Sequence, residues 1–330
     1  MFFGEVKTES SLGGILSSSI EVYKDKKKLK ISKGTVINKN LVDLFLLNNI
    51  KHVICAKLDN DEVEENTAVF MISKEIIASK NSFIKIQDPK NGRCNLVSIV
   101  DGIIEFQPNQ LYSINSITDD VGVASLKPFS KVKKNQIIAS IKAIPFGIKI
   151  KHLQNIVNIS QDCFKILPFQ KKNIHLIQTT NQNTREKILE KTLEVTKDRL
   201  SSCGINQITE KKCLHEIKSI CLELNESINE NADIILIFGT SAICDVNDVI
   251  PQSIKEIKGK ILRLGMPVEP GNLILLAEIN LSKKNISIIG MPGCAKSRKE
   301  NGVDWILWRK LCDLKVSSDD INFMANGGLL

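Results

Sequence analysis

The chain has 330 residues, of which 42% are hydrophobic and 25% are charged, a composition typical of a folded protein that is long enough for two domains. No run approaches the ~20 apolar residues that a membrane span requires, and residues 1–14 lack the basic and apolar regions of a secretion signal. We therefore expect a cytoplasmic protein with no membrane partner.

The net charge is +8, yet only 5% of the residues are aromatic, so solvated lysines are expected rather than a nucleic-acid-binding groove. The nine cysteines and four histidines are scattered singly, with no CxxC pair and no HExxH spacing. Disulfide frameworks and structural zinc sites need grouped ligands. The sequence therefore predicts neither, and no tightly held protein metal site.

The first part of the chain, residues 1–150, predicts a smaller β-rich α+β domain. Short alternating apolar runs at 82–86 and 102–106 predict strands, because Asp, Asn, Gly and Pro interrupt them. One helix is predicted over 40–48, where leucines and Phe45 fall on one face.

From residue 172 to residue 315, helix and strand patterns alternate, which predicts an α/β domain with a mostly parallel sheet flanked by helices. Residues 316–330 are expected to form a C-terminal tail. The predicted strands are 174–178, 233–238, 260–264, 273–278 and 286–290, the last two joined as a hairpin by a turn around 282–285. The predicted helices are 183–204, opened by a capping box of Asn183 and Glu186, then 214–228 and 302–311.

Three loops of this domain follow strands and are rich in small residues: 239–248, 265–272 and 290–297. In an open α/β sheet, ligands bind at the carboxyl ends of the strands, where helix amino ends present free N–H groups. Small residues let backbone amides approach a phosphate closely. Carboxylates beside such a site can hold Mg²⁺ together with phosphate oxygens. The alternative for the first loop is an ordinary turn in which Asp248 caps the next helix.

The order and wording of these loops, FGTSAICDVNDVIP, then GMPVEPGNLILLAE, then IIGMPGCAKS, resemble one family. It is the molybdopterin-binding (MoaB/Mog-like) family of molybdenum cofactor biosynthesis, whose domain is shared by molybdopterin adenylyltransferases and molybdotransferases. The resemblance implies that the loops hold the phosphate of molybdopterin or of the finished molybdenum cofactor. It implies ligand contacts at Gly239, Thr240, Ser241, Pro270, Gly271, Asn272, Pro292, Gly293, Cys294 and Ser297, catalytic positions at Asp245 and Asp248, and Asp248 as the magnesium ligand.

The chain also departs from the family pattern. Phe238 and Gly239 stand where two glycines are usual, the loop to Asp248 is longer, and Cys294 replaces an asparagine. A thiol at Cys294, close to a helix amino end, would have a lowered pKa and could touch molybdenum or the dithiolene sulfurs; the alternative is a small packing residue. These departures count more against adenylyl transfer than against binding of the pterin.

The resemblance reaches residues 29–53 more weakly, and residues 301–305 and 324–330 are similar to a branch often fused to a molybdenum cofactor cytidylyltransferase. This implies a binding protein that holds the pterin for a separate cytidylyltransferase. The competing function is a transferase enzyme, inserting molybdate into molybdopterin or activating it with ATP and Mg²⁺. A pyridine-nucleotide amidase is less expected, because that activity belongs to a domain of its own. The sequence leaves a homo-oligomer open.

Overall fold

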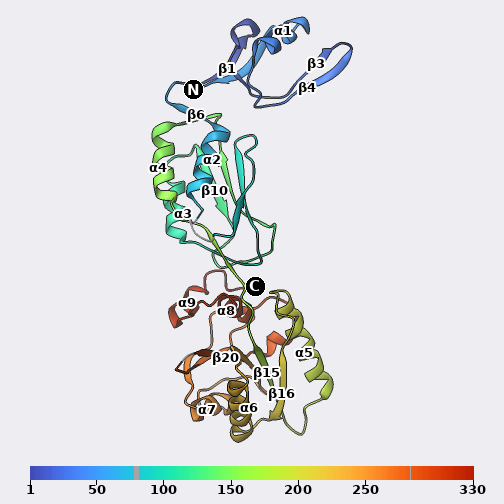
Figure 1. Cartoon of the computed structure of the whole chain (residues 1–330), viewed down its shortest axis with the longest axis vertical. Helices are drawn as coiled ribbons and strands as arrows, with labels where there is room; N and C mark the ends of the chain where they lie inside the picture. Colours follow the sequence, from blue (N-terminus) through green and yellow to red (C-terminus); the bar gives the residue numbers. More distant parts are fainter. Residues whose placement is uncertain (78–81, 283) are drawn as a thin grey trace. The chain divides into compact units, whose positions relative to one another are not determined.

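A computed structural model describes residues 1–77, 82–282 and 284–330. The chain divides into two compact units, Met1–Val100 with Ile104–Leu167, and Asp101–Ile103 with Pro168–Leu330 (Figure 1). Residues 316–330, the expected C-terminal tail, belong to the second unit. Throughout the described ranges, no helix has both the length and the apolar character needed to cross a membrane.

The first unit begins with a small antiparallel sheet and one helix. β5 (His52–Lys57) pairs with both β1 (Phe2–Lys7) and β2 (Ile15–Leu16), and β3 (Ile20–Lys24) and β4 (Lys27–Ile31) form a hairpin. The predicted helix is confirmed as α1 (Lys39–Leu47), which Asn38 caps through its side chain. The core of this part consists of Leu16, Val22, Ile37, Phe45, Val53 and Cys55.

The rest of the first unit packs three helices against short strands. The helices are α2 (Glu65–Glu75), α3 (Pro108–Asn115) and α4 (Ile150–Ser160). The strands are β6 (Glu62–Glu64), β7 (Ile84–Ile86), β8 (Arg93–Ser98), β9 (Gly102–Glu105), β10 (Val121–Ser125), β11 (Lys131–Val132), β12 (Ile137–Ala143), β13 (Gly147–Lys149) and β14 (Lys165–Pro168). The sheet orders are β10-β12-β8-β7, β11-β9-β14 and β13-β6. Strands were correctly predicted at 84–86 and 102–105.

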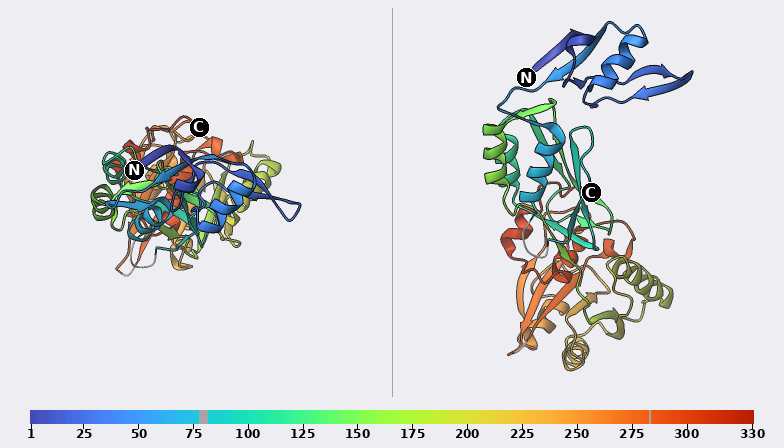
Figure 2. Two further views of the ribbon diagram at one scale, coloured as in Figure 1. Left: turned by 90° about the horizontal axis from the view of Figure 1, so that it is seen from above. Right: turned by 45° about the horizontal axis from the view of Figure 1, so that its top comes forward.

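The second unit, as far as it is described, is built on a six-stranded sheet in the order β16-β15-β17-β20-β19-β18. The strands are β15 (Ile174–Thr180), β16 (Thr209–Leu214), β17 (Ile234–Phe238), β18 (Lys260–Leu264), β19 (Leu275–Asn280) and β20 (Asn285–Met291). The helices are α5 (Glu186–Ser201), α6 (Ile217–Asn229), α7 (Val249–Glu256), α8 (Gly302–Leu311) and α9 (Ser318–Phe323). These helices lie around the sheet (Figures 1 and 2). β16, β15, β17 and β20 run parallel, β19 runs antiparallel to β20, and β18 runs antiparallel to β19 and therefore in the direction of β20.

The centre of this sheet follows from the apolar run in β17, whose five residues are all buried. A strand covered on both faces needs such a continuous run. Ile235 and Ile237 share a core with Ile220 of α6 and Ile254 of α7, so these two helices cover one face. The hairpin of β19 and β20 is confirmed by the pairing of Asn280 with Asn285; in its predicted turn, Lys283 lies outside the described residues.

Two local predictions were wrong. A helix had been predicted to begin at Leu214, but residues 209–214 form the edge strand β16, and α6 begins at Ile217. The strand was missed because it is polar and only partly buried. Its Lys211 ammonium pairs with Glu226 of α6 and with Glu230, which follows the end of that helix. The predicted capping box is absent as well: the Asn183 N–H donates to Asn181 Oδ1 at 3.0 Å, and α5 begins after Arg185 with no side-chain cap.

Candidate functional site

The three small-residue loops leave the sheet along one edge. Phe238 pairs with Met291 at the ends of the parallel strands β17 and β20, so residues 239–248 and 292–301 start side by side. This edge of the sheet, at which β15, β16, β17 and β20 end, is called the carboxyl edge below. Helix amino ends and free N–H groups gather at such an edge.

The turn between β18 and β19 reaches the same edge, because β18 runs in the same direction as β20. Leu264 pairs with Leu275, and Leu275 pairs with Gly290 near the end of β20. Residues 265–274 therefore lie at the carboxyl edge beside the loop that follows β20. The register of the sheet thus brings all three loops to one side of the second unit.

Gly239 opens the first loop in a position that a side chain cannot share. A Cβ there would lie 2.7 Å from the carbonyl oxygen of Ser241 and 3.1 Å from Ile250 Cδ1. The turn folds back on itself so tightly that only glycine fits. Thr240 is half-buried and Ser241 is exposed, so both hydroxyls follow directly after this close approach.

The two carboxylates of the first loop cap local backbone. Asp248 Oδ1 accepts from the Val249 N–H at 2.7 Å and so caps the start of α7, and Asp245 Oδ1 accepts from the Asn247 N–H at 2.7 Å. The two residues share one turn, because the Asp248 N–H donates to the Asp245 carbonyl at 3.1 Å. Across the described ranges, no three His, Cys, Asp or Glu residues are grouped as a metal site. Mg²⁺ at Asp248 would need oxygens from a ligand.

The second loop is shaped by contact with α8. A Cβ on Gly271 would lie 2.6 Å from the Gly302 nitrogen, and the Gly302 N–H donates to the Pro270 carbonyl at 2.9 Å. The Asn272 carbonyl accepts from the Met266 N–H at 2.9 Å and closes the turn. Gly271 is therefore required by helix packing, whatever else the loop binds.

A buried arginine of α5 fixes the third loop by hydrogen bonds to its backbone. Arg199, 8% exposed, donates to the carbonyls of Ser297 at 2.7 Å and Ala295 at 3.4 Å. It also forms an ion pair with Asp304, which closes the capping box of Asn301 at the start of α8. Pro292 is buried, whereas Gly293 and Ser297 are exposed. The loop is thus fixed while its outer face stays accessible.

The thiol of Cys294 does not have the lowered pKa that its position had suggested. Burial raises its pKa above the ordinary value, and the charge of Glu269 raises it further, while Arg199 acts in the opposite direction. A raised pKa favours the neutral thiol, so the lowered pKa expected for Cys294 is not found. The influence of Glu269 also shows that the second and third loops lie near each other.

His215, which the sequence analysis had not selected, lies at the carboxyl edge just after β16. Its Nδ1 is 2.9 Å from Thr179 Oγ1, and that hydroxyl donates to the Phe238 carbonyl at 3.2 Å. With the hydroxyl donating to Phe238, it accepts from Nδ1–H, and Nε2 is then the unprotonated nitrogen of a neutral ring. The pKa of His215 is lowered by burial, against the charge of Asp248. Its Cε1 lies 3.7 Å from the Cβ position of Gly239.

Lys296 is the second residue missed from the sequence. It ends the short 3-10 helix Gly293–Lys296, and its Nζ lies 5.8 Å from the ring centroid of Phe238. The side chain is half-buried, and burial lowers its pKa with no opposing carboxylate. Its position in the loop after a predicted parallel strand could have identified it. In the sequence alone, however, it cannot be distinguished from the many solvated lysines of the chain.

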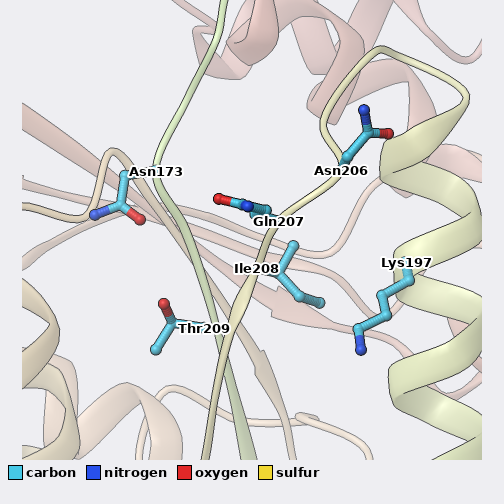
Figure 3. Close-up of a pocket in the computed structure, with 6 residues that line it drawn as sticks. All are labelled: Asn173, Lys197, Asn206, Gln207, Ile208 and Thr209. Atoms are coloured by element: carbon cyan, nitrogen blue, oxygen red, sulfur yellow. The ribbon is translucent and has the colours of Figure 1, made fainter.

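A polar cavity of about 440 Å³ lies at the opposite edge of the sheet. It is lined by Asn173, Lys197, Asn206, Gln207, Ile208 and Thr209, with Lys197 coming from α5 and the other residues from the segments that enter β15 and β16 (Figure 3). The residues predicted to bind the ligand are not among those lining it. The carboxyl edge and this cavity are therefore separate features.

No protein-family model matches the chain, and no curated protein matches it. Among solved structures, it is similar to the tungsten cofactor synthesizing protein MoaB from Pyrococcus furiosus, with a TM-score of 0.31 and 16% identity, over 44% of this chain and 89% of that one. It is also similar to a molybdenum cofactor biosynthesis protein from Pyrococcus furiosus, with a TM-score of 0.24 and 11% identity, over 96% of this chain and 66% of that one. At these values the likeness assigns no function to this chain.

Proposed function

We propose that the second unit, through residues 172–315, binds molybdopterin or the finished molybdenum cofactor at its carboxyl edge, and that the chain holds this pterin for a partner cytidylyltransferase. The observation that carries the proposal is the convergence of three small-residue loops on that edge. The resemblance of these loops to molybdopterin-binding domains supplies the class of ligand.

The first loop supports a phosphate contact. Gly239 is confined by Ser241 and Ile250, so a side chain is excluded where backbone would approach the ligand. Thr240 and Ser241 carry hydroxyls that can donate to phosphate oxygens. Pro292, Gly293, Cys294 and Ser297 would shape the opposite wall, because their loop starts beside the first one.

Binding without turnover is favoured by what the carboxylates do. Asp245 and Asp248 each use an oxygen to hold local backbone, and the described residues bring no third metal ligand beside them. Mg²⁺ keeps several waters and takes one or two carboxylates plus phosphate oxygens. The pair fits magnesium only as a complex with the ligand's phosphate.

A transferase is the second candidate, and the shared turn of Asp245 and Asp248 is the observation that favours it. Two carboxylates beside a phosphate loop can hold a magnesium ion that neutralises phosphate charge. In a transferase, Asp248 would hold the magnesium ion, and Gly239 would keep backbone N–H groups close to the negative charge that develops on the phosphate in the transition state.

The experiment is to incubate the purified chain with molybdopterin, and then with added ATP, Mg²⁺ and molybdate. We expect the pterin to co-elute with the protein in stoichiometric amount, without formation of adenylylated pterin or active cofactor. Turnover would establish the transferase instead. Absence of pterin from the protein fraction would overturn both candidates.

Asp248→Asn separates the two candidates further, because asparagine keeps an oxygen that can cap α7 but loses the charge. The binding candidate predicts nearly unchanged retention of the pterin. The transferase predicts that a magnesium-dependent step is lost while retention persists. Asp319→Asn, at an exposed position in α9, is the matched control.

A further inference from the structure

We propose that Lys296 is the cation that binds the phosphate group of the ligand at the carboxyl edge, with its ammonium supported over the ring of Phe238. The inference rests on the proposed function for the identity of the pterin. The phosphate contact itself can be tested separately.

The position of the ammonium supports this assignment. Phe238 is the last residue of β17, and Gly239 of the first loop follows it directly. The Lys296 Nζ lies 5.8 Å from the centroid of the Phe238 ring, within the range of a cation–π contact. The positive charge of Lys296 in the third loop therefore lies beside Phe238, directly before the start of the first loop.

The absence of a protein partner is the second observation. Several buried or half-buried cations of the second unit have carboxylate partners: Lys211 with Glu226 and Glu230, Lys284 with Asp233, and Arg199 with Asp304. Lys296 is half-buried, yet in the described part of the chain no carboxylate or carbonyl accepts from its Nζ. Desolvating an unpaired charge is costly, so an anion from outside the protein would stabilise this arrangement.

The neighbouring groups indicate a phosphate. The ammonium offers three N–H donors, and the hydroxyls of Thr240 and Ser241 follow Gly239 in the adjacent loop. A phosphate monoester has several oxygens to share among such donors and carries more charge than a carboxylate. Asp304 and two loop carbonyls occupy the two terminal nitrogens of the buried Arg199 guanidinium.

The phosphate contact is tested with inorganic phosphate alone. The full chain is reductively methylated with ¹³C-formaldehyde, which preserves the lysine charge, and Lys296→Arg identifies the signal of Lys296 in the NMR spectrum. We expect phosphate to shift this signal in a saturable manner, and chloride at equal ionic strength to leave it in place. An unmoved signal, or an equal shift at the exposed Lys299, would overturn the proposal.

The contact with the pterin is tested by measuring binding of molybdopterin before and after phosphatase treatment. Lys296→Met should weaken binding of the phosphorylated form at least about tenfold, as expected for loss of a charge-assisted hydrogen bond. It should leave the dephosphorylated form unaffected, and Lys296→Arg should retain most of the affinity. Lys299→Met is the matched control, and circular dichroism verifies that each variant is folded.

The outcomes separate the two proposals. Pterin binding that is equal in the wild type and in Lys296→Met would overturn the role of Lys296 and leave the proposed function standing. A saturable phosphate shift at Lys296 in a chain that binds no pterin would overturn the proposed function and retain the phosphate site.

Discussion

Gly239 and Gly271 are both tightly enclosed, but by different neighbours. Ser241 and Ile250 surround Gly239 within its own loop, whereas Gly271 meets the backbone of α8. The sequence marked both as ligand residues, because a glycine in a loop looks the same in either role. Only the three-dimensional packing shows that Gly239 shapes its own loop, whereas Gly271 allows α8 to pack closely against the second loop.

Gly239→Ala should therefore reduce pterin binding at least about tenfold, because the new methyl group would lie 2.7 Å from the Ser241 carbonyl and force the loop to move. Equilibrium binding of molybdopterin checks this. Gly122→Ala, in the first unit, is the matched control, because a Cβ there meets no atom within 4 Å in the described structure. Equal loss in both variants would contradict the role given to Gly239.

The buried His175 makes a prediction about pH. Burial lowers its pKa below the ordinary value of 6.5, against the charge of Glu230, so the folded state favours the neutral ring. The unfolded chain then binds more protons, and the free energy of unfolding should fall as the pH drops from 6.5 through the folded pKa. The pKa of His215 is lowered too, so the wild-type decline has two contributions.

His175→Gln should remove one of these contributions and flatten the dependence of unfolding free energy on pH. Urea unfolding at pH values on both sides of 6.5 measures the slope. The exposed His52→Gln should leave the slope as it is in the wild type. A slope that is equally steep with and without His175 would contradict the account.

At the scale of elements, β17 could be predicted from sequence because five consecutive apolar residues leave few alternatives to a central strand. β16 could not, because an edge strand with two lysines and a glutamate has no apolar pattern, and its position is set by pairing with β15 and by ion pairs to Glu226 of α6 and to Glu230 just after it. The same limit applies to the site. The three loops were visible as small-residue turns, whereas His215 and Lys296 depend on which strands end together.

Arg199 connects α5, the third loop and α8, so its removal should act on all three. Arg199→Met would leave Asp304 buried without its partner, and the loss of one member of a buried ion pair costs about 3–5 kcal/mol. The midpoint of urea unfolding should fall accordingly. Arg298→Met is the control, because Arg298 is exposed with its partners Glu194 and Asp198, and its midpoint should change little. Equal midpoints of urea unfolding for both variants would contradict this stabilising role of Arg199.

At the scale of the whole molecule, the chain consists of two units with separate hydrophobic cores. Residues 168–330 should therefore fold when expressed alone and retain the affinity of the full chain for molybdopterin. Circular dichroism, a cooperative urea transition and equilibrium binding check this. An isolated second unit that folds but binds no pterin would show that the first unit contributes ligand contacts.

The most direct test of the central claim is amide hydrogen exchange of the full chain with and without molybdopterin. The account predicts slower exchange in residues 239–248 and 290–297 on binding, because these loops share the carboxyl edge. Exchange around the cavity at residues 206–209 should not change. Protection confined to that cavity, or to the first unit, would contradict the claim that the carboxyl edge binds the pterin.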